Sequence, residues 1–533
     1  MADPTTKDMG QYIHRVKVLN LPKREMGSVK QLFQSHGVME RHKKAPAWDY
    51  AYINYETEAA AKEAMKKLNG LPFKKKFLTT EYSRISEETF RKRFENKKKE
   101  VVVDTRTPTE RLAHQLKHNF GRKYMASLKR KIAQLPEMSD AGRKQVAWAF
   151  NREGYCEMLD PIASPKTDGY RTKCEFTIGR NLDNEPAVGF LLGMYREGIT
   201  SVMDSSECLH VPNIAKRIAK AMEGYVRASV YDVYDRSERT GVWRSVMVKT
   251  QHTGDGKEPM KASGLTDDQL AAEKENLKKY WTSLEGINVK TLLLQIWDGD
   301  SNGLNEEAQT EVLMGDGYVY EELLGSRFRI SHNAFFQVNT PAAELLYAKC
   351  AEWCNLDQHK KTTLLDLCCG TGTIGITMAK SVDRVVGIEM IPEAVVDAKM
   401  NAKTNNIVNT QFYAGKIEEK IDLVTKEEND AVVAVLDPPR SGVHSSVIRA
   451  VRESPQIEKV IYISCDAKQA MQNFIGLCRP TSNRFKGLPF RPLRAVSVDL
   501  FPHTEHSELL IEFVRIQEDQ GPTDCHAVSQ EEK

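Results

Sequence analysis

The feature that most constrains the fold of this chain is a glycine-containing turn between an apolar strand and a helix. Residues 362–367 (TTLLDL) run directly into CCGTGTIGI, so Asp366 precedes Gly370, Gly372 and Gly375. Glycine at such a turn lets the backbone approach a ligand without a clash from Cβ. The next apolar stretch, RVVGIE, ends in Glu389, whose carboxylate could accept hydroxyl groups of a ribose. The pair predicts a nucleoside cofactor, and the alternative is a close-packed turn with a purely structural role.

The residues after Phe328 alternate between apolar strands and amphipathic helices. The strands end at Leu367, Ile388, Leu436 and Ile463. This alternation is typical of a parallel sheet covered on both faces, and so of an α/β, Rossmann-like domain. The spacing Asp-x-x-x-Gly-x-Gly resembles that of S-adenosylmethionine-dependent methyltransferases more than the dinucleotide-binding pattern Gly-x-Gly-x-x-Gly.

Three further motifs follow strands of this expected sheet. The strand AVVAVL leads to Asp437-Pro-Pro-Arg440, KVIYIS leads to Cys465, and a predicted hairpin carries FPHTEHSE, which ends at Glu508. Ligands bind at the carboxyl ends of strands in open α/β sheets, so these side chains are expected to meet there. A lone cysteine is most often inert packing, but at this edge Cys465 is a candidate nucleophile. From the residues alone, any titratable side chain of the last loop could be the acid or base.

The formal charge of +3 conceals a division of the chain. Residues 1–131 carry 30 Lys and Arg against 15 Asp and Glu, a net +15, whereas the remaining 402 residues carry 46 against 58, a net −12. A basic N-terminal quarter favours a polyanionic partner, with nucleic acid the first candidate.

Residues 12–83 have the order βαββαβ, which resembles an RNA-recognition motif. Tyr50 and Tyr52 occupy the aromatic positions of the strand WDYAYINY and are candidate RNA-binding residues. Trp48 and Asp49 replace the usual basic residue and glycine, and a protein-binding variant of the fold is the alternative. We expect a basic helical connector over 84–150, a β-rich central RNA-binding domain over 151–330, the catalytic domain over 331–516 and a polar tail over 517–533.

Five motifs in order, FFQVN, DLCCGTGTIG, DPPRSG, SCD and FPHTEHSE, resemble the tRNA and rRNA uracil-5-methyltransferase family. The resemblance covers roughly residues 150–515, and the N-terminal domain is similar to that of animal rather than bacterial members. It implies that Cys465 is the nucleophile, Glu508 the base and Arg440 a substrate contact. It also implies S-adenosylmethionine as cofactor, contacted by Gln337, Cys368, Thr373, Glu389 and Asp437.

The implied reaction explains why these residue types are needed. A thiolate adds to carbon 6 of uracil so that carbon 5 can accept a methyl group, and a carboxylate then removes the proton from carbon 5. The resemblance implies tRNA as the substrate, with a T-loop uridine as the target. A cytosine-5 RNA methyltransferase is the nearest rival, but that group carries a second cysteine where Arg440 stands. An RNA-binding or tRNA-folding protein without essential catalysis is the rival from another class.

The ten cysteines are scattered without a C-x-x-C pair, and the first residues, MADPTTKDMG, lack the apolar stretch of a secretory signal. We therefore expect free thiols, no metal, no iron–sulfur cluster and no membrane partner. We also expect a monomer in the cytoplasm, the nucleus or both.

Overall fold

The computed structural model describes residues 12–23, 25–38, 42–44, 48–55, 57–74, 76–86, 110–136, 138–152, 154–192, 200–235, 240–251, 257–262, 265–297, 308–332, 334–354, 361–424 and 431–517. The basic run at 91–100 and the tail beyond 517 lie outside these residues.

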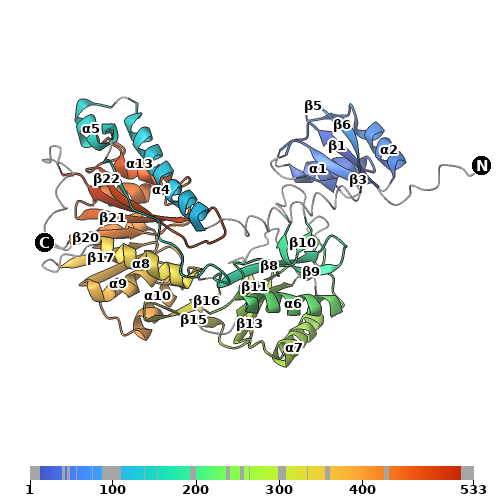
Figure 1. Ribbon diagram of the computed structural model, residues 1–533. Helices are drawn as coiled ribbons and strands as arrows, with labels where there is room; N and C mark the ends of the chain where they lie inside the picture. The colour runs from blue at the N-terminus through green and yellow to red at the C-terminus, as the bar shows by residue number, and fades with distance from the viewer. Residues whose placement is uncertain are drawn as a thin grey trace, which may run out of the picture.

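The N-terminal domain is a four-stranded antiparallel sheet with two helices, in the strand order β2-β3-β1-β6 (Figure 1). Its elements are β1 (Tyr12–Leu19), α1 (Met26–Ser35), β2 (His42–Lys43), β3 (Ala51–Tyr55), α2 (Glu58–Leu68), a small ribbon of β4 (Pro72–Phe73) and β5 (Lys76–Phe77), and β6 (Thr79–Ser86). Alternation along β3 buries Ala51, Ile53 and Tyr55 against the helices, so Tyr52 lies on the opposite face. The described strands and helices follow the predicted order.

The central domain has a seven-stranded sheet in the order β10-β9-β8-β11-β12-β13-β14. Its strands are β8 (Lys173–Arg180), β9 (Pro186–Leu191), β10 (Val202–Met203), β11 (Ser245–Lys249), β12 (Lys257–Ala262), β13 (Thr291–Ile296) and β14 (Gln309–Met314). Two helices, α6 (Asn213–Ala228) and α7 (Asp267–Ser283), contribute buried side chains to the core of this domain.

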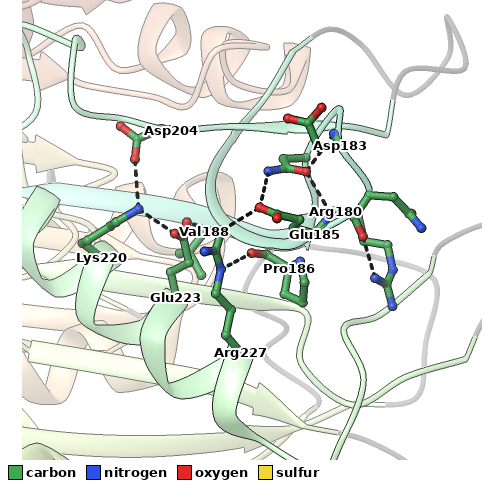
Figure 2. A network of polar contacts seen from close by, with 11 residues as sticks. Arg180, Asp183, Glu185, Pro186, Val188, Asp204, Lys220, Glu223 and Arg227 are labelled. Carbon is green, nitrogen blue, oxygen red and sulfur yellow. Dashed lines mark hydrogen bonds and ion pairs between the residues drawn. The ribbon is translucent and has the colours of Figure 1, made fainter.

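A polar network attaches α6 to β9 (Figure 2). The buried carboxylate of Glu223 accepts a hydrogen bond from the Val188 amide at 3.2 Å and contacts Lys220 Nζ at 2.6 Å and Arg227 Nη2 at 3.3 Å. The Arg227 Nε also donates to the Pro186 carbonyl. The region expected to be β-rich is a sheet with two helices, α6 and α7. The amphipathic spacing of α6 is hard to distinguish from short strands in the sequence.

The C-terminal domain is built on an eight-stranded sheet in the order β19-β18-β17-β20-β21-β23-β22-β7. The strands are β7 (Glu157–Met158), β17 (Thr362–Leu367), β18 (Arg384–Glu389), β19 (Thr410–Ala414), β20 (Ala431–Leu436), β21 (Ile457–Ser464), β22 (Phe490–Val498) and β23 (Glu508–Arg515). The helices are α8 (Thr340–Cys354), α9 (Thr373–Met378), α10 (Pro392–Thr404), α11 (Ile417–Val424), α12 (Ser445–Glu453) and α13 (Met471–Cys478), with a short 3₁₀ turn over Ala379–Ser381. Strands β17 to β21 are parallel, as predicted.

A two-stranded hairpin of β15 (Tyr318–Leu323) and β16 (Ser326–Ser331) precedes this domain. Strand β16 packs beside α10, close to the start of the Rossmann-like domain (Figure 1).

The segment expected to be a connector contributes to the core of the C-terminal domain. Helix α4 (Glu110–Ala133) lies against β22 and α13, and α5 (Asp140–Gln145) and a 3₁₀ turn (Ala147–Phe150) follow it. Fully buried Met125, Leu128 and Ile132 join the same apolar cluster as the sheet. The basic residues of this segment favoured the prediction of a connector. The buried apolar side chains of α4 instead determine that the helix packs on the sheet.

Candidate active site

The candidate catalytic residues meet at one edge of the C-terminal sheet. Parallel strands β17, β18, β20 and β21 all end there, directly before or at Cys368, Glu389, Asp437 and Cys465. Strand β23 runs antiparallel to β21, so its first residue, Glu508, lies at the same edge. Residues up to 140 positions apart in the chain meet here because the carboxyl ends of the parallel strands and the first residue of the antiparallel strand β23 share this edge.

The glycine turn after β17 is shaped by backbone conformations that glycine accommodates. Gly370 and Gly372 have φ values of 52° and 79°. A Cβ on Gly372 would lie 3.0 Å from Phe412 Cζ and 3.1 Å from Ala398 Cβ. The Gly370 amide donates to Glu389 Oε2 at 3.0 Å, so the acidic residue of the next strand also fixes the turn.

A buried polar layer lies behind this turn. The Gln337 side chain lies next to the Asp437 carboxyl group, and the hydroxyl of Tyr347 on α8 lies next to both Gln337 and Thr373. The structure therefore brings Gln337, Thr373 and Asp437 together with Cys368 and Glu389. Tyr347 was not singled out from the sequence, because its position in an apolar helix gives no sign that its hydroxyl reaches the site.

Burial raises the pKa of two carboxyl groups at this edge. Asp366 is fully buried, and its Oδ2 accepts a hydrogen bond from the Gly375 amide at 2.8 Å. Burial raises the pKa of Asp366 to about 7. The pKa of Asp437 is also raised to about 7, first by burial and then by the charge of Asp366. A cation bound here would favour the ionised form of both groups.

Three buried oxygen atoms around this edge have no hydrogen-bond partner within the described part of the chain. They are Asp366 Oδ1, Thr371 Oγ1 and Glu508 Oε2. Buried polar groups are normally paired, and a bound ligand or ion is one explanation for those that are not. Together with the glycine turn and the Glu389 carboxylate, they fit a cationic nucleoside cofactor such as S-adenosylmethionine.

Cys465 and Glu508 form the second part of the site. The β21–β23 register pairs Ser464 with Leu509, so Cys465 and Glu508 flank the last pair at the sheet edge. Burial raises the pKa of the Cys465 thiol to about 12, with further contributions from the charges of Glu508 and Asp437, while Arg440 lowers it. Burial also raises the pKa of Glu508 well above its usual range, with a further contribution from Asp437. Arg440 itself is exposed.

The loop before Glu508 is held from several elements. The Asp168 carboxylate contacts His503 Nε2 at 2.7 Å, and the Tyr170 hydroxyl donates to the Pro502 carbonyl at 3.1 Å. Lys117 on α4 forms an ion pair with Asp499. None of these partners was predicted, because each lies more than 300 residues away in the chain.

Tyr50 and Tyr52 are not part of this cluster; they belong to the N-terminal sheet. Their rings lie 5.4 Å apart, and Trp48 stacks on Tyr50 at 4.8 Å. Arg15 Cζ lies 5.0 Å from the Tyr52 ring centre, and Lys17 Nζ lies 5.2 Å from that of Tyr50. Trp48, noted in the sequence only as a departure from the motif, therefore extends the aromatic surface.

Comparison with known proteins identifies the family. The family model described as tRNA (Uracil-5-)-methyltransferase matches residues 304–512. The tRNA (uracil-5-)-methyltransferase homolog A of Homo sapiens is 34% identical over 96% of this chain and 84% of its own length. The chain belongs to the tRNA (uracil-5-)-methyltransferase family.

Other members of the family support the same assignment. Homolog A of Mus musculus is 35% identical over 98% of this methyltransferase and 87% of its own length. Homolog B of Danio rerio is 35% identical and covers 78% of this chain and 87% of its own length. The expected resemblance is confirmed, and this methyltransferase is an S-adenosylmethionine-dependent enzyme.

A solved structure shares the fold of this methyltransferase. It is the Pyrococcus abyssi tRNA (uracil-54, C5)-methyltransferase in complex with S-adenosyl-L-homocysteine, with a TM-score of 0.51 and 20% identity, covering 74% of this chain and 83% of that one. The α/β fold class is confirmed by this likeness.

Two kinds of feature are absent from the described residues of this methyltransferase. No helix there is both long and apolar enough to cross a membrane. No group of three or more His, Cys, Asp or Glu side chains in those ranges could hold a metal ion.

Proposed function

We propose that this methyltransferase transfers a methyl group to carbon 5 of a uridine in tRNA, in the T-loop, through a covalent adduct with Cys465. The observation that carries the proposal is the meeting of Cys465 and Glu508 at the sheet edge that also holds the glycine turn. A thiol and a carboxyl group beside a nucleoside-cofactor site are what this chemistry requires.

In the proposed reaction, the Cys465 thiol releases its proton to solvent and the resulting thiolate forms a bond to carbon 6 of the uracil, so that the electron pair of the C5–C6 double bond becomes available at carbon 5. S-adenosylmethionine, when bound, would supply the electrophilic methyl group to which carbon 5 forms a bond, and S-adenosylhomocysteine would be the leaving group. Glu508 then accepts the proton from carbon 5, the C5–C6 double bond re-forms, and the C6–S bond breaks to return the thiolate. Arg440 would stabilise the negative charge that develops on the base.

The residues that would hold the cofactor are Gln337, Cys368, Thr373, Glu389 and Asp437. Their support is the geometry around the turn: the Gly370–Glu389 hydrogen bond and the Gln337 contacts to Asp437 and Tyr347. Cys368 adopts a positive φ of 69° and its amide donates to the Ile388 carbonyl. A role for Cys368 therefore falls to its backbone more than to its thiol.

The RNA would meet two basic surfaces. The β2-β3-β1-β6 sheet of the N-terminal domain and its half-buried aromatic side chains support an RNA-recognition-motif-like role, in which Tyr50 and Tyr52 would stack on bases. Helix α4 carries seven Lys and Arg against one Glu, and Arg122 and Lys123 are exposed beside the catalytic sheet. Such a helix fits the phosphate backbone of an RNA whose target base enters the site.

The covalent mechanism is tested with tRNA containing 5-fluorouracil, which lacks a removable proton at carbon 5. With S-adenosylmethionine, the wild-type protein should give a covalent protein–RNA band that resists denaturation. Cys465→Ala should give none. Glu508→Gln should accumulate the band with ordinary tRNA, because the proton at carbon 5 is not removed. Absence of the wild-type band, or its survival in Cys465→Ala, contradicts the mechanism.

The role of the N-terminal domain is tested separately by deleting residues 1–83. The deletion should weaken tRNA binding and leave S-adenosylmethionine affinity unchanged. Unchanged tRNA affinity would assign the domain to protein recognition. Methylated-uridine mapping in RNA from cells lacking the protein tests the T-loop assignment. A monomeric state, a cytoplasmic or nuclear location and a tRNA-folding role stay predictions.

A further inference from the structure

Polar side chains of helix α10 and its C-cap accept hydrogen bonds from backbone amides along the edge of strand β16, as a neighbouring β-strand would. Asp397 and Asn401 lie within the helix and Asn405 is its C-cap, and because the three are spaced four residues apart they lie on the same side of it. They accept hydrogen bonds from alternate amides of β16: Ser331 to Asp397 Oδ2 at 3.3 Å, Arg329 to Asn401 Oδ1 at 2.7 Å and Arg327 to Asn405 Oδ1 at 2.8 Å.

The periodicities of helix and strand make this pairing possible. Four helical residues rise about 6.0 Å and two strand residues about 6.6 Å, so three consecutive contacts stay in register. The edge of β16 that faces α10 is thereby paired without a further strand.

Asn401 makes one contact that Asn405 does not. Its Nδ2 donates to the Arg329 carbonyl at 3.3 Å and to the Thr371 carbonyl at 3.1 Å, and the residue has no exposed surface. Thr371 lies in the glycine turn, between Gly370 and Gly372. The Asn405 Nδ2 donates instead to the Arg327 and Asn401 carbonyls.

The turn is therefore held from two sides. The Glu389 carboxylate accepts the Gly370 amide, and the Asn401 amide donates to the next carbonyl along the chain. Because Gly370 and Gly372 both have positive φ, the turn gains little rigidity from its own backbone. Thr371 as a residue is 2% exposed, and a carbonyl in such a buried position is costly to leave unpaired.

We propose that Asn401 is a positioning residue that fixes the cofactor-binding turn, an inference that rests on the proposed role of that turn. Asn401 does not act on the methyl group or the uracil. It holds the Thr371 carbonyl, and so the backbone amides around it, in the conformation that receives S-adenosylmethionine.

The test compares Asn401→Asp with Asn405→Asp in the full-length protein. Each substitution keeps the shape and the acceptor oxygen and removes two N–H donors, but only the first releases the turn. Titration calorimetry with S-adenosylhomocysteine gives the Kd, and steady-state kinetics give KM for S-adenosylmethionine and for tRNA. Hydrogen exchange of the peptide spanning the glycine turn reports its local opening.

We expect Asn401→Asp to raise the Kd and the KM for S-adenosylmethionine by about 5- to 100-fold, the range of one to two buried hydrogen bonds. The KM for tRNA should change less than about twofold, and Asn405→Asp should change neither constant by more than that. Exchange of the turn should accelerate in Asn401→Asp alone. If the added charge prevents folding, the uncharged Asn401→Ser replaces it with the same expected result.

Equal effects of the two substitutions, or unchanged Kd in Asn401→Asp, would overturn the inference and leave the proposed function standing. Failure of the wild-type protein to bind S-adenosylhomocysteine would instead contradict the assigned cofactor site.

Discussion

The protonation state of Cys465 gives the most quantitative prediction. Burial raises its pKa to about 12, so the free enzyme should hold the proposed nucleophile as a thiol. An ordinary cysteine has a pKa near 9, and the difference of about three units lowers the thiolate fraction at about pH 8 by roughly 1,000-fold. A more basic thiolate is also more nucleophilic, which restores about 20-fold of that loss. We therefore expect Cys465 to react with a small disulfide about 50-fold more slowly than free cysteine.

The assay is modification by dithiodipyridine, with each cysteine-containing peptide quantified by mass spectrometry between about pH 7 and 10. The Cys465 rate should rise about tenfold per pH unit without a plateau, because the thiol stays largely protonated over this range. Glu508→Gln removes the second-largest cause of the raised pKa. It should accelerate the reaction about 3- to 4-fold for each unit by which the pKa falls, although under the proposed mechanism the same substitution should block turnover.

Cys156 supplies an internal control. It is also half-buried with a pKa raised to about 12, but burial and Glu157 are the causes, so Glu508→Gln should leave its rate unchanged. A Cys465 rate equal to that of free cysteine at about pH 8, or a plateau near pH 9, would refute the reasoning.

Three further predictions concern the framework of the site. Asp366, whose pKa is raised from 3.8 to about 7, stabilises the fold most when protonated, so stability is lost as the pH rises from about 4 to above 7. Asp366→Asn should remove this dependence, so between about pH 5 and 8 its free energy of unfolding in urea should rise by about 2–3 kcal/mol relative to that of the wild type. Parallel plots of the two unfolding free energies against pH would contradict the prediction. Leu128→Ala on α4 should lower the free energy of unfolding by about 2–5 kcal/mol, whereas Lys123→Ala at an exposed position should lower it by less than about 0.5 kcal/mol. Equally small effects of the two substitutions would show that α4 does not contribute to the core. Gly387→Ala places a Cβ 2.4 Å from Phe412 Cδ1 and 2.9 Å from Cys369 Sγ, so it should lower the free energy of unfolding by about 1–3 kcal/mol and weaken S-adenosylhomocysteine binding. Adding Phe412→Leu should restore much of the stability and of the binding. If it restores neither, the Phe412 ring is not the cause.

Much of the catalytic domain could be predicted from the sequence because its signals are local. Strand β17 is a continuous apolar run, the turn after it requires glycine, and the strand ends mark where side chains converge. These features need only a few neighbouring residues to be read.

Packing between distant segments could not be predicted in the same way. The basic residues of α4 suggested a connector, whereas Leu128 and its apolar neighbours place the helix on the catalytic sheet. The helices of the central domain were missed for a similar reason, since amphipathic spacing is hard to separate from strands in short segments.

By itself, the sequence predicted the α/β class and the glycine turn with Glu389, because motif order and strand periodicity are properties of the chain. It also carried the family resemblance from which Cys465 and Glu508 are proposed as the reactive pair. Only the tertiary structure decided that Glu508 stands beside Cys465 through the antiparallel register of β21 and β23, and that Asn401 reaches the Thr371 carbonyl. Hydrogen bonds and desolvation depend on distances in space, and residues remote in the chain acquire those distances only when the sheet and its helices pack.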